Sequence, residues 1–218
     1  MMTTLRPLNL ILFLIPLMAA CAPGGQEDPE VPPEDSSSGL ITSLILNFRP
    51  VSGSETLSFG WTASKGDDEV EVDSIPLPDR TDHHHHDTQA YNLEVELWND
   101  HADPVVDVGS EVEDAAEEYQ LFFTGSAVEG PATGSNAGAV IAHDYLDSDS
   151  EGLPLGLENR VDTLAWGAGL LTVTLRHLPS QDSQEIKNSS LADDVANDGF
   201  DAIGGETAIQ VTFEIEVE

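Results

Sequence analysis

Three acidic residues alternate with serines over residues 147–151 and are followed by a glycine. Alternate residues of a tight loop point their oxygens inward, and a glycine at the sixth position permits the sharp turn that such a loop needs. A carbonyl at the seventh position and a glutamate at the twelfth complete the spacing of a calcium-binding loop. Because hard oxygen ligands select calcium over softer metals, the stretch predicts a calcium site. The predicted ligands are Asp147, Asp149, Glu151, Leu153 and Glu158.

The same stretch has a simpler interpretation as a solvated acidic turn, because carboxylates fill many positions of this chain. Glu151 stands at the fifth position, where Asp or Asn is usual, and its extra methylene predicts weak affinity. The stretch resembles an EF-hand calcium loop, although its flanks are typical of strand and coil rather than helix. Its Gly-Leu-Pro-x-Gly-Leu-Glu tail, from Gly152 to Glu158, also resembles a thrombospondin type 3 repeat. Both resemblances imply calcium as the ligand.

Four consecutive histidines between Asp82 and Asp87 form a second candidate metal site. Neutral imidazoles are good ligands for Zn²⁺ and Cu²⁺, and about two consecutive ones on an extended loop can reach one ion. This pattern favours an alternative function, the capture of zinc or copper for an uptake system. A polar loop with incidental metal affinity is the other interpretation. The four candidate ligands are His83, His84, His85 and His86.

The charge of the chain excludes some classes of partner. With 41 Asp and Glu against 7 Lys and Arg, the net charge is −34, which repels nucleic acids and anionic membrane surfaces. Such an acid excess is typical of halophilic proteins, whose self-repulsion is screened by salt. The chain has no G-x-S-x-G elbow, no P-loop and no dinucleotide fingerprint, so we expect a non-enzymatic protein.

The first twenty residues predict a signal peptide. Their apolar run, residues 8–17, is too short to span a bilayer, which needs about 20 residues. Residues 18–21 (MAAC) resemble the bacterial lipobox, and this resemblance implies that Cys21 is the lipidated, palmitate-bearing N-terminus. Because Ala22 rather than an acid follows, Gram-negative sorting implies the outer membrane. Residues 21–39 then read as an acidic Pro/Ser/Gly-rich tether.

Period-two alternation predicts an all-β domain over residues 40–218. In residues 209–217, for example, Ile209, Val211 and Phe213 share one face and polar residues the other. We expect an immunoglobulin-like antiparallel sandwich of about nine short strands, with one or two short helical turns. The predicted strands are 42–48, 56–62, 70–75, 91–100, 119–124, 139–146, 161–166, 169–179 and 209–217. The helical turns are 110–118, capped by Ser110, and 191–196.

Four segments resemble an uncharacterised group of envelope lipoproteins from Gram-negative bacteria. They are 111–123 (EVEDAAEEYQLFF), 147–157 (DSDSEGLPLGL), 172–179 (TVTLRHLP) and 204–215 (GGETAIQVTFEI). The resemblance implies a β-rich lipoprotein at the outer membrane, on its periplasmic or surface face, and implies no activity.

Together these patterns predict a lipid-anchored, non-enzymatic cell-envelope protein that binds a divalent cation, with calcium favoured. The alternatives are zinc or copper capture through the histidine run, and a structural or adhesion module without a bound ion. The expected partners are the membrane, through the lipid on Cys21, and an envelope protein or metal-uptake receptor.

Overall fold

The computed structural model describes residues 40–64, 70–78, 88–180 and 186–218, all of which belong to the compact unit Ser36–Glu218. The predicted signal peptide, the lipidation site Cys21, the tether and the run His83–His86 lie outside the described residues. Within the described ranges, neither α-helix has the length and apolarity that crossing a bilayer requires.

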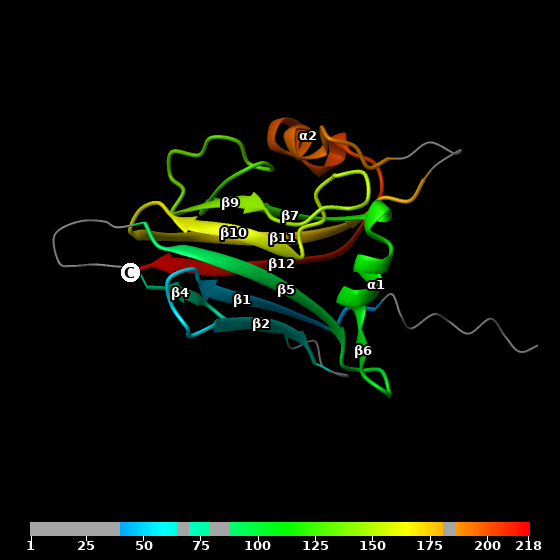
Figure 1. Ribbon diagram of the computed structural model, residues 1–218, viewed down its shortest axis with the longest axis horizontal. Helices are drawn as coiled ribbons and strands as arrows, with labels where there is room; N and C mark the ends of the chain where they lie inside the picture. The colour runs from blue at the N-terminus through cyan, green and yellow to red at the C-terminus, as the bar shows by residue number, and fades with distance from the viewer. Residues whose placement is uncertain (1–39, 65–69, 79–87, 181–185) are drawn as a thin grey trace, which may run out of the picture. The chain divides into compact units, whose positions relative to one another are not determined.

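Two β-sheets form the domain (Figure 1). The larger sheet contains β1 (Ser43–Pro50), β2 (Leu57–Ala63), β3 (Val70–Val72), β5 (Ala90–Asn99), β6 (Val106–Asp107), β8 (Val128–Glu129), β9 (Ile141–Tyr145) and β10 (Glu158–Thr163). The smaller contains β4 (Ile75–Leu77), β7 (Tyr119–Thr124), β11 (Gly167–His177) and β12 (Glu206–Val217). Their orders are β3-β2-β1-β5-β10-β9-β8, with β6 beside β5, and β4-β12-β11-β7. The predicted all-β sandwich is confirmed, although β4–β12 and β8–β9 pair in parallel.

The main core lies between the inner faces of the two sheets. In β12 every second residue from Ile209 to Val217 is buried and the residues between are exposed, so the alternation seen in the sequence marks a half-buried strand. In β7, by contrast, Leu121 and Phe123 join the main core, while Phe122 packs into a second apolar cluster beneath α2 (Leu191–Asp198) and the 3-10 helix η3 (Phe200–Ala202). This strand is therefore apolar on both faces.

Two local predictions need correction. Residues 70–75, predicted as one strand, form β3 and β4, which belong to different sheets. Asp73 makes the corner: its amide donates to the Gly60 carbonyl and its carboxylate accepts from the Gly60 amide. The first helix, α1 (Val108–Asp114), is capped by Asp107, whose carboxylate accepts from the amide and hydroxyl of Ser110, and not by Ser110 itself. A 3-10 turn, η2 (Ala116–Glu118), follows it.

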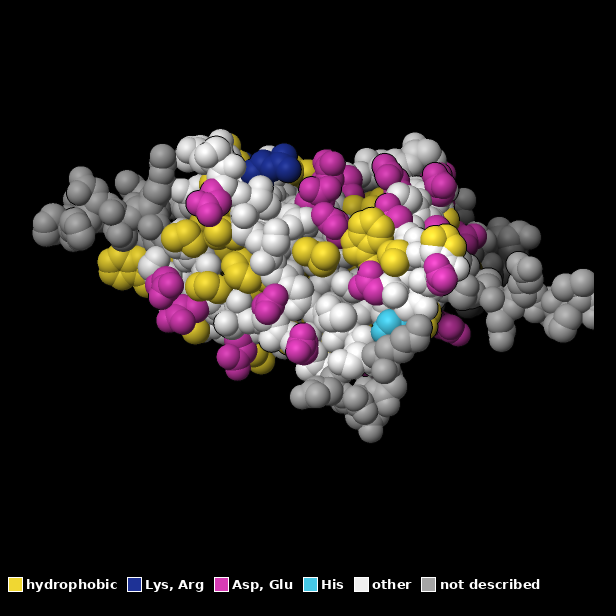
Figure 2. Space-filling model, turned by 90° about the horizontal axis from the view of Figure 1, so that it is seen from below, with side chains coloured by type: hydrophobic (Ala, Val, Ile, Leu, Met, Phe, Trp, Pro, Cys, Tyr) yellow, Lys and Arg dark blue, Asp and Glu magenta, His cyan; other side chains and the backbone are white. Residues whose placement is uncertain are grey.

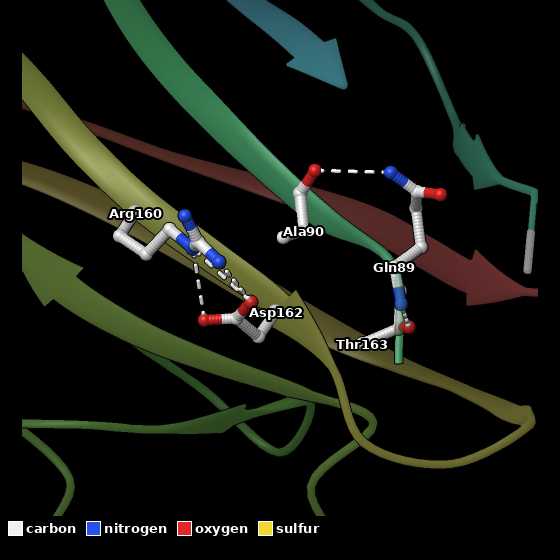
Figure 3. A network of polar contacts seen from close by, with 5 residues as sticks. All are labelled: Gln89, Ala90, Arg160, Asp162 and Thr163. Carbon is white, nitrogen blue, oxygen red and sulfur yellow. Dashed lines mark hydrogen bonds and ion pairs between the residues drawn. The ribbon is translucent and has the colours of Figure 1, made fainter. Parts of the chain in front are cut away.

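Basic side chains are scarce on the described surface. Figure 2 shows acidic side chains spread across one whole face, with Lys or Arg at a single place. Of the four basic residues in the described ranges, Arg176 and Lys187 are buried. Arg160 pairs with Asp162 at 2.9 Å on the outer face of β10, close to the hydrogen bond from the Gln89 amide to the Thr163 hydroxyl (Figure 3).

Candidate functional site

An acidic cleft of about 750 Å³ lies on the outer side of the larger sheet, between β5, α1, η2 and the 147–158 loop. Trp98 contributes to its lining, and no basic residue does. Packing many carboxylates around one hollow lowers the local potential and attracts cations. The carboxylates that line it are Glu94, Glu96, Asp107, Glu113, Asp114, Glu117, Asp147, Asp149 and Glu158.

The Asp147 carboxylate is hydrogen-bonded to backbone amides of its own loop. Its two oxygens accept hydrogen bonds from the amides of Gly156, Leu157 and Glu158 at 2.7, 2.7 and 2.9 Å. These bonds fold the loop back onto the start of β10. Gly156 has a φ of +95° there, and a Cβ at this position would stand 2.8 Å from the Leu121 Cβ, so only glycine fits without strain.

The Asp149 carboxylate is buried and also fully engaged. One oxygen accepts from the amides of Glu151 and Leu153 at 3.0 and 2.8 Å, and the other lies 2.8 Å from the Lys187 Nζ. The Asp149 and Lys187 side chains are only 1% and 2% exposed. Burial by itself would raise the pKa of Asp149, but the hydrogen bonds from Lys187 and the Leu153 amide outweigh it and hold this pKa below its usual value.

The remaining predicted loop ligands share no common partner among the described residues. The Leu153 carbonyl accepts from the Asp149 amide at 2.9 Å, whereas Glu151 is exposed. Glu158 lies on β10 and lines the cleft. Across the described residues, no group of three or more His, Cys, Asp or Glu is arranged to hold a metal ion. The loop thus differs from an EF-hand, in which these oxygens converge on one ion, and calcium binding through it stays a prediction.

The two walls of the cleft are joined where the loop meets η2. The Ser150 hydroxyl donates to the Glu117 carboxylate at 2.8 Å, and this bond lowers the pKa of Glu117. The Lys187 ammonium also spans the junction, because it donates to the Ala116 carbonyl at 2.7 Å. The cleft is therefore held together by contacts between segments far apart in the sequence.

On the floor of the cleft, Glu94 of β5 and Glu158 of β10 are direct cross-strand partners. Neither carboxylate has a hydrogen bond or ion pair with any other described residue, whereas neighbouring Glu96 accepts from Asn47 and Trp98. Side chains directly opposite each other on antiparallel strands have Cβ atoms about 5 Å apart, and like charges there are destabilising. Neither carboxylate forms a direct ion pair, although the exposed Arg49 lines an adjoining hollow of about 330 Å³ together with both of them.

Sequence reasoning missed Lys187, Glu94 and Glu117. Lys187 carries one signal that points to it: it is one of only two lysines in a chain with 41 acidic residues. A lysine in a chain with so many more carboxylates than basic groups is a candidate for a structural ion pair. The strand register that joins Glu94 to Glu158 has no comparable signal.

In comparisons with known proteins, no protein-family model, no curated protein and no solved structure matches this chain.

Proposed function

We propose that this chain is a lipid-anchored, non-enzymatic protein of the cell envelope that binds divalent cations in its acidic cleft, with calcium as the ion of first choice. The observation that carries the proposal is the pair Glu94–Glu158, two exposed carboxylates on directly opposed strand positions, neither of which forms an ion pair with a described residue. An ion between them relieves their repulsion and takes up part of the negative potential of the cleft. The lipobox at Cys21 supports the anchor.

Calcium suits this place better than a transition metal, because the cleft offers only oxygen ligands. With two protein carboxylates, the ion keeps several waters in its coordination shell of six to eight oxygens. We therefore expect weak binding, in the range of about 10⁻⁴–10⁻³ M that extracellular modules use.

Calorimetry tests the proposal on the chain from residue 21 onward with Cys21→Ser, which removes the lipid. Titration with CaCl₂ at constant ionic strength should give saturable heat, and Glu94→Gln with Glu158→Gln should weaken the affinity at least about tenfold, a loss of about 1.4 kcal/mol.

The matched control is Glu214→Gln with Glu216→Gln. These two exposed glutamates lie on β12 in the other sheet, and their replacement removes the same formal charge. If both double variants bind calcium equally well, binding follows net charge alone and the cleft is not the site.

A further inference from the structure

The 147–158 loop already contains a cation, and that cation is a side chain. Lys187 lies outside the loop, just before α2, and its Nζ reaches the Asp149 carboxylate at 2.8 Å. An ammonium has three donors, and a second one here is taken by the Ala116 carbonyl at 2.7 Å. A carboxylate and a backbone carbonyl are also the ligand types that calcium takes in acidic loops.

We infer that the Lys187 ammonium is the resident cation of the 147–158 loop: it closes the loop in place of a metal ion and ties it to the η2 wall of the cleft. The second half of the loop is closed without any cation, because the Asp147 carboxylate accepts three backbone amides. The loop thus keeps its acidic spacing but needs no metal to fold.

Because the Asp149–Lys187 pair is buried, Asp149 cannot bind a metal ion and keep its ion pair with Lys187. With Asp149 and Lys187 only 1% and 2% exposed, an ion that bound Asp149 would have to displace the ammonium and leave it buried without a carboxylate. Removing one partner of a buried ion pair is strongly destabilising. The Glu94 and Glu158 side chains take no part in the contacts of Asp149 and Lys187, so ion binding between those two carboxylates and the role of Lys187 are separable.

The first test uses the unmodified chain. Hydrogen exchange of the Glu151 and Leu153 amides, which Asp149 holds, should be equally slow in excess calcium and in excess chelator. Faster exchange of these two amides in chelator would overturn the inference, because the loop would then depend on a metal. These amides report the loop itself, so calcium bound between Glu94 and Glu158 does not obscure the result.

The second test is Lys187→Met, which keeps an unbranched side chain shorter by one atom and removes the charge. The melting temperature should fall by about 6–20 °C, and the Glu151 and Leu153 amides should exchange at least about tenfold faster. The matched control is Arg160→Met, which breaks an ion pair with partners 36% and 31% exposed and should shift the melting temperature by a few degrees at most. An unchanged melting temperature in Lys187→Met would contradict the inference.

Calcium then distinguishes a resident cation from an ordinary ion pair. In Lys187→Met, about 10 mM calcium should restore part of the protection at the Glu151 and Leu153 amides, since the vacated oxygens again have a cation available. Lys187→Met with Asp149→Asn should show no such recovery. If calcium leaves the exchange of these amides unchanged in Lys187→Met, the ammonium does not take the place of a metal ion.

Discussion

His143 makes the stability of the domain depend on pH in a way that can be isolated. Its ring is buried and stacks on Phe123 at a centroid distance of 4.2 Å. The side-chain nitrogen of Asn159 donates to the Gly156 carbonyl, so the Asn159 oxygen faces His143 and must accept from its Nε2–H at 3.0 Å. The other ring nitrogen, Nδ1, has no hydrogen-bond partner among the described residues.

A proton on Nδ1 would thus place a buried charge against an aromatic ring. Burial lowers the pKa of His143 to about 4, although the hydrogen bond with Asn159 partly opposes this shift. In the unfolded chain the pKa is about 6.5. Between these two values the unfolded state binds more protons, so the free energy of unfolding falls as the pH drops from about 6.5 toward 4. From pH 7 to pH 4.5 this one group removes about 2 kcal/mol.

The assay is urea unfolding of the wild type and of His143→Phe at both pH values in the same salt. At pH 7 the variant should be less stable by about 1–3 kcal/mol, because the buried Asn159 oxygen loses its donor. At pH 4.5 this deficit should shrink by about 2 kcal/mol, since phenylalanine takes up no proton. The control Leu121→Val changes the core without changing a titratable group, so it should lower the free energy of unfolding by the same amount at pH 7 and at pH 4.5. A His143→Phe deficit that does not change with pH would refute the reasoning.

Three further outcomes follow from the loop and the charge of the chain. Asp147→Asn should lower the free energy of unfolding by about 1–3 kcal/mol in a urea titration. The reason is that an NH₂ group, which donates, replaces one of the two oxygens that accept from the three backbone amides. A variant as stable as the wild type would contradict this role. Gly156→Ala should lower the free energy of unfolding by about 2–4 kcal/mol in the same titration, because the backbone has a φ of +95° and a Cβ there would lie 2.8 Å from the Leu121 Cβ. Gly152→Ala should lower it less, because the space around a Cβ at that position is open. Raising NaCl from about 0.1 to 1 M should raise the melting temperature, because the Debye length falls from about 10 to 3 Å; a melting temperature that falls with salt would speak against acid self-repulsion.

The sequence predicted those strands whose alternation is regular and long. β12 and β11 could be predicted from their alternation, because one face of each strand is buried along much of its length. The two-residue strands β6 and β8 contain too few positions to show a period. The corner at Asp73 was not predictable either, because what separates β3 from β4 is a pair of hydrogen bonds with Gly60 on another strand.

The candidate site shows the same division between local and distant contacts. The compact acidic turn was evident from the spacing of Asp147, Asp149 and the glycine after Glu151, because these contacts form within a few residues. The direction in which the carboxylates point was not evident, because it depends on Lys187 and on the strand register of Glu94. Spacing of acidic residues alone does not distinguish a loop that holds a metal from one that holds a lysine.

The start of β1 and the end of β12 lie at opposite ends of the sandwich (Figure 1). β1 begins beside Trp98, and β12 ends beside Gly167. A pull between the start of β1 and the end of β12 therefore acts along both strands, and each strand is bonded to neighbours on its two sides. Because ladder hydrogen bonds run across the strands, they bear this load together in shear instead of opening one after another. A force applied between the start of β1 and the end of β12 would therefore have to break many of these hydrogen bonds at once.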